Sequence, residues 1–184
     1  DGTTPTQTYC VYIGGATVNV PNVNPRDNIF FNNVTSSNGP TLPQTVSFRL
    51  GPTTATNLAS TATNNLPYAG PPAADHLIYV DGAVDALTPK QTLGDYQAFV
   101  APRESASITG DPLFLNTTIG SNANFLHISN VSPAFHTGAP VTGITDDYDG
   151  DLRHPCTPDI GADEVTSYTG AAIANVTITK TADA

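Results

Sequence analysis

The segment DDYDGDLRHPCTPDIGADEV, residues 146–165, concentrates acidic side chains in a chain that otherwise contains few charges. Four of its acids surround a glycine with the spacing by which loops offer oxygen ligands to Ca²⁺. An EF-hand also needs a glutamate at its twelfth position, and counting from Asp147 that position is Pro158. The spacing therefore indicates a candidate Ca²⁺ site of a kind other than an EF-hand. Its ligands would be Asp146, Asp147, Asp149 and Asp151.

The same segment has a structural explanation. Aspartate side chains accept hydrogen bonds from neighbouring backbone N–H groups in turns, so they can shape a loop without any ion. Arg153 could then pair with Asp159 or Glu164, because a guanidinium group binds a carboxylate as a planar fork. We favour this second interpretation, in which the segment closes the end of the fold, over metal binding and over catalysis.

Catalysis on a polysaccharide would need paired carboxylates, or a basic residue beside Ca²⁺, in a groove. The candidates lie in and after HLIYVDGAVD, and we expect structural roles for them because an Asp-His pair commonly precedes a strand. His127, inside FLHIS, is expected to be a strand residue, and His154 has no second His or Cys at zinc spacing. The candidates are Asp75, His76, Asp81, Asp85, Arg103 and Glu104.

Cys10 and Cys156 are the only cysteines, so only one intramolecular disulfide is available to the chain. Together with a surface rich in Thr and Asn, they predict a disulfide and an extracellular setting; the alternative is two unrelated buried thiols. Four N-x-[ST] sequons are glycosylation candidates and would have to lie on the surface. They begin at Asn33, Asn116, Asn130 and Asn175.

The charge balance excludes several partners. The formal net charge is −10, from 16 acidic against 6 basic residues, which argues against binding to nucleic acid. An anionic membrane surface is disfavoured for the same reason, and no apolar run approaches the roughly 20 residues of a membrane helix. Hydrophobic residues make up 39% of the chain, which is typical of a globular protein.

Short apolar runs are the elements that must position these side chains. They are rich in β-branched and aromatic residues and are bounded by Asn, Gly, Asp or Pro, which predicts strands that end in turns. With 16 prolines and 15 glycines, the chain leaves little room for helices, so we expect an all-β fold. The runs lie at 8–20, 28–33, 45–50, 76–82, 111–116, 125–129 and 175–179.

A sandwich, a barrel and a solenoid all remain compatible with these runs. NIFFNN resembles a strand that turns a corner on asparagine, and stacked coils of a parallel β-helix repeat such a corner. Residues 35–75 and 83–107 look like insertions, of which 51–75 would be a loop draped over the stack. The expected stacked core is Ile29, Phe30, Phe31, Leu113, Phe114, Phe125 and Leu126.

Three fragments in order carry a family resemblance: TGDPLFLN (109–116), SPAFHTGAP (132–140), and DDYDGDLR with PDIGADEV (146–153 and 158–165). They resemble the C-terminal end of right-handed parallel β-helix proteins that bacteria secrete or display on their surface. That family shows D-P-x-F, S-P-A-x-x-x-G, D-x-D-G-x-x-R and D-I-G-A-x-E in this order. His136 departs from the pattern, since the family usually has Asp there.

The resemblance also implies a domain organisation. Residues 1–165 would be the terminal coils of the β-helix with long loop insertions, and residues 1–27 could cap an otherwise open coil edge. The tail ANVTITKTADA, at 174–184, resembles the opening of an immunoglobulin-like repeat found in tandem in large bacterial surface proteins. Residues 166–184 would then be a linker and the first strand of another module, or a strand used in assembly.

Two functions are compatible with the sequence. The first is a non-catalytic structural or adhesive segment of a cell-surface or filament-forming protein, whose partners would be copies of itself, through the C-terminal strand, or surface glycans. The second is a carbohydrate-binding or polysaccharide-cleaving β-helix module, which would need exposed aromatic side chains along a groove. The available residues for that groove are Tyr68, Tyr79, Tyr96 and Phe99.

Overall fold

The computed structural model describes residues 8–14, 22–34, 44–51, 57–81, 88–119 and 123–165. These residues are rich in β-strand and include one short helix, which confirms the β-rich class predicted from the sequence. The predicted strand at 175–179, the 166–184 linker and Asn175 lie outside the described residues. The elements are β1 (Thr8–Ile13), β2 (Ile29–Phe31), β3 (Thr45–Leu50), β4 (Leu66–Tyr68), β5 (His76–Asp81), β6 (Thr88–Lys90) and α1 (Leu93–Val100).

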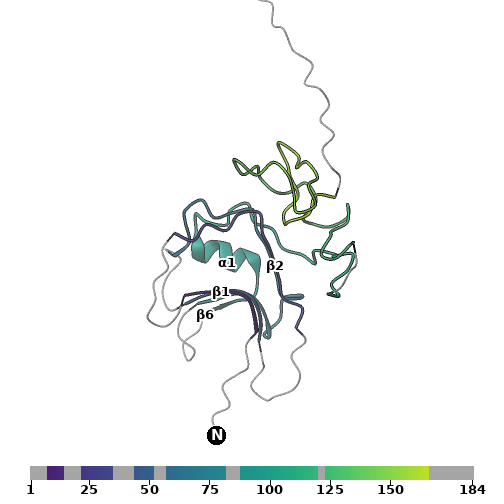
Figure 1. The fold of residues 1–184 in the computed structure, drawn as a ribbon. Coiled ribbons are helices and arrows are strands. Elements are labelled where there is room, and N and C mark those ends of the chain that lie inside the picture. The colour runs from purple at the N-terminus through teal and green to yellow at the C-terminus, as the bar shows by residue number, and fades with distance from the viewer. Residues whose placement is uncertain are drawn as a thin grey trace, which may run out of the picture.

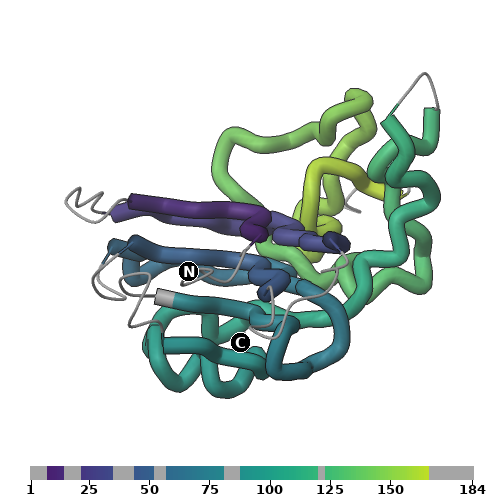
Figure 2. Tube along the Cα trace, turned by 90° about the horizontal axis from the view of Figure 1, so that it is seen from below, coloured from purple at the N-terminus to yellow at the C-terminus, as the bar shows by residue number. Residues whose placement is uncertain are grey.

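The strands form two sheets of mostly parallel pairing. One sheet has the order β1-β3-β5-β6, in which the first three strands are parallel and β6 runs antiparallel to β5. The other sheet pairs β2 with β4, also in parallel. Figure 2 shows the result as layers, with the purple, blue and teal parts of the chain lying one over another. Successive passes of the chain therefore stack in the same direction.

The centre of this arrangement is β3, TVSFRL, which is buried along its whole length. A parallel strand with neighbours on both sides and covered faces is expected to carry this β-branched and aromatic composition. Val11, Phe48 and Tyr79 occupy equivalent positions on β1, β3 and β5, and the rings of Phe48 and Tyr79 stack with centroids 6.1 Å apart. The core is thus a column of side chains that runs across the strands.

The helix α1 was not predicted from the sequence. Thr92 caps it: the Thr92 side chain accepts a hydrogen bond from the Asp95 backbone N–H at 3.2 Å, which satisfies one free donor of the first turn. Tyr96 and Val100 are its buried residues, and the helix lies over the β1-β3-β5-β6 sheet (Figure 1). With eight residues between prolines it is too short for a helical period to be recognised. No helix in the described ranges is long and apolar enough to cross a membrane.

The interpretation of residues 35–75 as an insertion is wrong, because β3 and β4 both lie inside this segment. Its Ω-loop part, 51–75, also contributes Leu58, which is fully buried and forms a parallel bridge with Val23. The apolar residues Leu58 and Leu66 are widely spaced among small polar residues, yet each reaches the core. The segment is therefore one pass of the layered stack.

The predicted core also needs correction. Leu113 and Leu126 are about half-exposed, at 43% and 44%, and both have positive φ angles. The runs DPLFLN and FLHIS are not strands, and a single parallel bridge between Asn116 and Phe125 joins them. Asp111 accepts a hydrogen bond from the Leu113 N–H at 2.9 Å, so a turn replaces the expected strand. Ile29, Phe30, Phe31, Phe114 and Phe125 are partly buried.

A second buried cluster attaches the C-terminal residues to the layers. Leu66 packs there with Ile128, Ala134 and Ile160, and the partly buried Ile29 lies against them. Gly161 has a φ of +114°, and a Cβ at this position would lie 2.9 Å from Ile29 Cδ1, so a glycine suits the close approach. This packing fixes the acidic segment against the corner that precedes β2.

Candidate functional site

Asp147 organises the first half of the acidic segment. Its Oδ1 accepts hydrogen bonds from the backbone N–H groups of Asp149 and Asp151, both at 2.9 Å. Its Oδ2 accepts from the Glu164 N–H at 2.8 Å, which joins the turn to the second half of the segment. Both oxygens of this carboxylate are therefore used to hold backbone, as expected for an aspartate that stabilises a turn.

Asp159 and Glu164 also accept hydrogen bonds from backbone N–H groups, in the interior of the protein. Asp159 is fully buried, and its two oxygens accept from the His136 N–H at 2.6 Å and the Val165 N–H at 2.8 Å. Glu164 is also buried and accepts from the His154 N–H at 3.0 Å and the Asp159 N–H at 3.1 Å. Each carboxylate thus joins two segments that are separate in the chain.

Arg153 lies beside the Glu164 carboxylate, although its contacts differ from the predicted fork. Its Nη2 donates to the backbone carbonyls of Asp159, at 2.6 Å, and Gly161, at 3.0 Å. Its Nε lies 3.6 Å from Glu164 Oε2. The guanidinium group therefore compensates the buried negative charge while it binds backbone oxygens. We call Arg153, Asp159 and Glu164, with Asp147, the clasp.

The four acids of the candidate Ca²⁺ site have different partners. Asp147 belongs to the clasp, Asp149 faces His127, and Asp146 and Asp151 are exposed. Among the described residues, two groups of potential ligand side chains converge, and neither is this set of four. One is His127, Asp149 and Asp163; the other is His136, Asp159 and Glu164.

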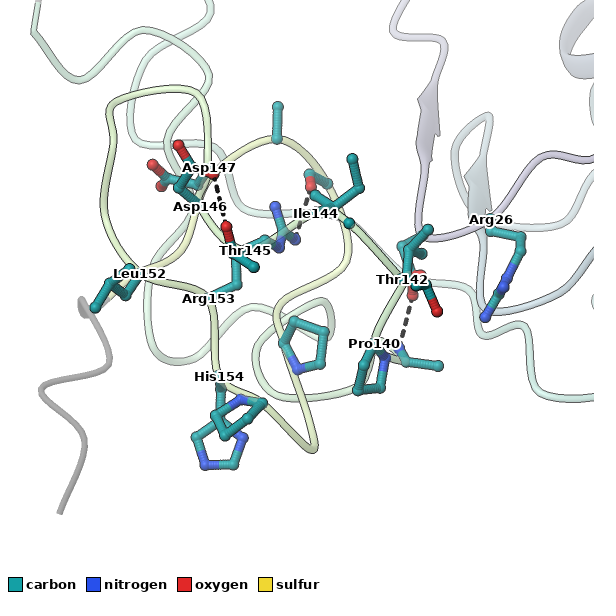
Figure 3. A pocket seen from close by; sticks show the side chains of 18 of the residues that line it. Arg26, Pro140, Thr142, Ile144, Thr145, Asp146, Asp147, Leu152, Arg153 and His154 are labelled. Carbon is teal, nitrogen blue, oxygen red and sulfur yellow. Dashed lines mark hydrogen bonds between the residues drawn. The ribbon is translucent and has the colours of Figure 1, made fainter. Parts of the chain in front are cut away.

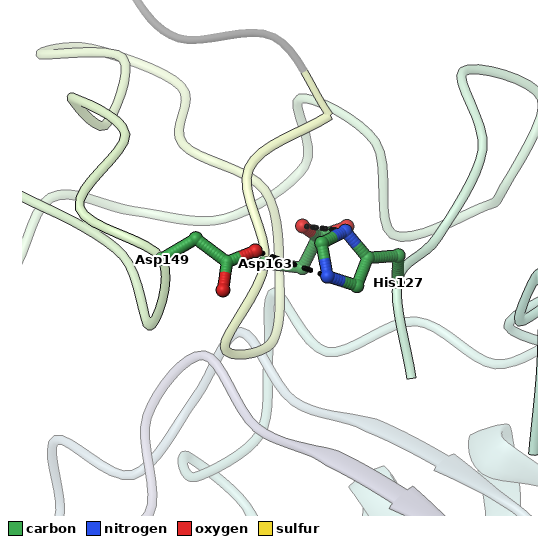
Figure 4. A group of neighbouring side chains, drawn as sticks. All are labelled: His127, Asp149 and Asp163. Atoms are coloured by element: carbon green, nitrogen blue, oxygen red, sulfur yellow. Dashed lines mark ion pairs between the residues drawn. The ribbon is translucent and has the colours of Figure 1, made fainter. Parts of the chain in front are cut away.

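His127 lies between two carboxylates (Figure 4). Its Nε2 is 3.0 Å from Asp149 Oδ2, and its Nδ1 is 3.0 Å from Asp163 Oδ1. Burial raises the pKa of Asp163, an effect that hydrogen bonding from the Ile128 N–H and the charge of His127 partly offset. His127 therefore ties its loop to the acidic segment, and it is not the strand residue that we expected.

The second group offers less to an ion. Both carboxylates, of Asp159 and Glu164, already accept backbone N–H groups. The His136 ring stacks on Phe135, with centroids 4.0 Å apart, and lies 5.3 Å from the His154 ring. A metal ion would have to displace the hydrogen bonds of the clasp, so this group is part of the closure.

The catalytic candidates do not meet in a groove within the described residues. His76 Nδ1 lies 3.0 Å from the Pro71 carbonyl, and Arg103 Nε donates to the Leu58 carbonyl at 2.7 Å. Glu104 is buried and accepts from Asn65 Nδ2 and from the Ser107 hydroxyl. The Asp81 side chain and Asp85 lie outside the described residues, and Asp75 is partly buried before β5.

The predicted aromatic platform is wrong. Tyr79 and Tyr96 are buried, at 0% and 2% exposure, and their rings stack in the core with centroids 4.6 Å apart. Tyr68 is partly buried and stacks on Phe31. Phe99 is the exposed member, and Lys90 Nζ lies 4.6 Å from its ring centroid. These side chains stabilise the layers and offer no continuous surface to a sugar.

The predicted disulfide is not formed in the structure, where both thiols are free and exposed. Cys10 lies in the edge strand β1, beside the backbone of Phe31, and burial raises the pKa of its thiol. Cys156 lies in a loop of the acidic segment, where its N–H donates to His154 Nδ1 at 3.3 Å. Of the sequon asparagines, Asn33 and Asn130 are exposed, whereas Asn116 is partly buried.

A cleft of about 920 Å³ lies where the acidic segment meets the corner before β2 (Figure 3). One wall is formed by residues 24–28 and the other by residues 139–148 and 152–155. Sequence reasoning missed this site, because its walls are more than a hundred positions apart, as the hydrogen bond from the Ala139 N–H to Asp27 Oδ1 shows. No motif in residues 24–28 signals a binding role.

Comparisons of the chain with models of protein families, with curated proteins and with solved structures find no match. The function is therefore inferred from the geometry described above.

Proposed function

We propose that the chain is a non-catalytic structural segment of an extracellular surface or filament protein, built as the terminal coils of a right-handed parallel β-helix. The observation that supports this proposal is that three successive segments of the chain stack on one another in register. The Leu66 N–H donates to the Asn28 carbonyl at 2.8 Å, and the Ile108 N–H donates to the Asn65 carbonyl at 3.0 Å. The same step of backbone pairing thus occurs twice at one corner.

Side chains repeat at this corner as well. Asn65 Oδ1 accepts from the Asn28 N–H at 3.1 Å, and the Ser107 hydroxyl accepts from the Asn65 N–H at 2.9 Å. This asparagine ladder is the arrangement expected where coils turn on stacked asparagines. A stack in which each coil contacts its neighbours is stiff along its axis, which suits a spacer or an adhesin stalk better than a diffusing enzyme.

The stack predicts a graded response to truncation of its core. Leu66, fully buried in the middle pass, is expected to cost about 3 kcal/mol of unfolding free energy on change to alanine. Ile29, its partly buried partner in the first pass, should cost about half as much. Urea unfolding followed by circular dichroism measures both variants. Equal costs at the two positions would contradict the layered order.

The proposed location and partner have separate support. Charged residues make up only 12% of the chain, and the asparagines of two sequons, Asn33 and Asn130, are exposed. Within the described residues, β1 ends its sheet with β3 as its one strand neighbour, whereas β6 and α1 cover the side of β5. An edge strand of this kind accepts an added strand. We propose residues 175–179 of a neighbouring copy as that strand.

Electron microscopy of the purified chain tests this assembly. We expect ordered fibres or sheets from the full chain and dispersed particles after removal of residues 170–184, because the donor strand is then missing. Circular dichroism of the shortened chain controls for folding. Fibres that persist after the removal would contradict strand exchange, and monodisperse full-length monomers would contradict the filament role.

A further inference from the structure

The cleft between the corner before β2 and the acidic segment is lined by two residues that each have a buried polar atom without a hydrogen-bond partner among the described residues. The buried Arg26 Nε and the buried Asp27 Oδ2 have no hydrogen-bond partner within the described part of the chain. Both residues line the cleft. Buried polar atoms in folded proteins nearly always have partners, so a donor and an acceptor left unpaired on successive residues indicate a missing ligand group or ordered water.

Two adjacent hydroxyl groups would satisfy this pair. One hydroxyl oxygen accepts from Arg26 Nε–H, and the neighbouring hydroxyl donates to Asp27 Oδ2, so each group is used in the sense that its chemistry allows. We propose that the cleft binds a vicinal diol of a neutral saccharide. Binding includes small movements of both side chains toward the cleft, because Arg26 Nε and Asp27 Oδ2 are both buried in the free structure.

The charges around the cleft favour a neutral ligand. Asp27, Asp146 and Asp147 contribute carboxylates to its lining, against the guanidinium groups of Arg26 and Arg153. Arg153 is already occupied by the carbonyls of Asp159 and Gly161. An anionic sugar would therefore meet an excess of negative charge, on a chain whose net charge is −10.

Hydrogen bonds hold the backbone of Asp27 and the other oxygen of its carboxylate. Asp27 Oδ1 accepts from the Ala139 N–H at 2.8 Å, and the Asp27 carbonyl accepts from the Gly161 N–H at 2.9 Å. Its φ of +53° is sparsely populated by residues other than glycine, asparagine and aspartate. The backbone of Arg26 is held as well, because its carbonyl accepts a hydrogen bond from Asn28 Nδ2 at 2.8 Å.

The rest of the cleft also suits a sugar. Tyr148 lines it and is 77% exposed, so its ring is available to the apolar face of a pyranose. Pro140, Val141 and Ile144 add apolar surface to the same wall. At about 920 Å³ the cleft lies within the range of small-molecule sites and is large enough for a short oligosaccharide. This site does not depend on the structural role proposed above.

Nuclear magnetic resonance of the ¹⁵N-labelled chain tests the proposal directly, through the Ala139 and Gly161 amides that bond Asp27. The probes are methyl mannoside, methyl galactoside and methyl glucoside at tens of millimolar, because single sugars bind weakly. Sodium glucuronate is the anionic comparison, and the deoxy analogue of the best glycoside, lacking one hydroxyl of a vicinal pair, tests the diol. We expect saturable shifts with at least one neutral glycoside, and about tenfold weaker binding of its deoxy analogue.

Two variants test the contributions of Arg26 and Asp27 to binding separately from those of the other residues that line the cleft. Asp27→Asn keeps the oxygen that accepts from Ala139 and tolerates the positive φ, but it can replace the free acceptor with a donor. Arg26→Lys keeps the charge and removes Nε–H. Each should weaken glycoside binding about tenfold with an unchanged melting temperature, while the exposed Asp111→Asn variant binds normally.

Three results would overturn the proposal. The first is no shift of either amide with any neutral glycoside. The second is stronger binding of glucuronate than of the neutral glycosides. The third is unchanged affinity in a folded Asp27→Asn variant.

Discussion

Replacement of Asp159 by alanine is expected to lower the free energy of unfolding by about 3–5 kcal/mol. The carboxylate is fully buried and accepts the N–H groups of His136 and Val165, which would lose their partners together. Urea unfolding at neutral pH measures the loss, and the variant should melt far below the wild-type chain.

Asp151→Ala is the matched control. Asp151 lies in the same acidic segment, but its side chain is exposed and its contacts to Asp147 are made by backbone N–H and carbonyl groups. We expect a change within about 0.5 kcal/mol. A loss of similar size in both variants would mean that the total charge of the segment, and not the clasp, determines stability.

The contact between Arg153 and Glu164 is the part of the site that the sequence allowed us to anticipate. Arg153, Asp159 and Glu164 are close in the chain, and turn chemistry acts over a few residues, so local spacing carries the information. Local spacing did not predict which atoms of these residues contact one another. Arg153 binds the Asp159 and Gly161 carbonyls because the carboxylates of Asp159 and Glu164 are occupied by backbone N–H groups.

The cleft could not be anticipated, because its defining contact joins Asp27 to the Ala139 N–H across 112 positions. The same limit explains the error over residues 35–75. The pairings of Ile29 with Leu66 and of Val46 with Leu77 have different sequence offsets, so no single period marks the passes of the chain. A pass without a period and with many small polar residues is indistinguishable from a loop until its partners are known.

Replacement of Glu104 by alanine is the second change that is expected to lower the stability of the protein strongly. The buried carboxylate of Glu104 accepts two hydrogen bonds from Asn65 Nδ2, at 3.1 and 3.0 Å, and one from the Ser107 hydroxyl. Glu104→Ala would remove the buried acceptor of the Ser107 hydroxyl and would leave Asn65 Nδ2 with the Pro25 carbonyl as its remaining acceptor, with an expected loss of about 3–4 kcal/mol. Thermal unfolding of the variant measures it. An exposed acid, changed as Asp111→Asn, should leave the melting temperature within a few degrees.

Glu104→Gln should change the pH dependence of stability. Burial raises the pKa of Glu104 above the ordinary value of 4.5, and the hydrogen bonds from Asn65 and Ser107 offset part of the rise. A carboxyl group whose pKa is raised by folding holds its proton longer in the folded state. Its contribution is therefore fully present below pH 4.5 and is lost as the pH rises through the folded pKa.

Glutamine has no proton to lose, and it can still accept from Asn65 and donate to Ser107. The stability of Glu104→Gln relative to the wild-type chain should therefore increase from pH 4.5 upward, by about 1.4 kcal/mol for each pKa unit of the shift. Chemical unfolding at a series of pH values measures the difference, in which the contributions of Asp27 and Asp163 cancel because both chains contain them. A difference that is constant with pH would show that Glu104 has the same proton affinity folded and unfolded. The buried carboxylate would then act only as an acceptor for Asn65 and Ser107, since no proton would be taken up on folding.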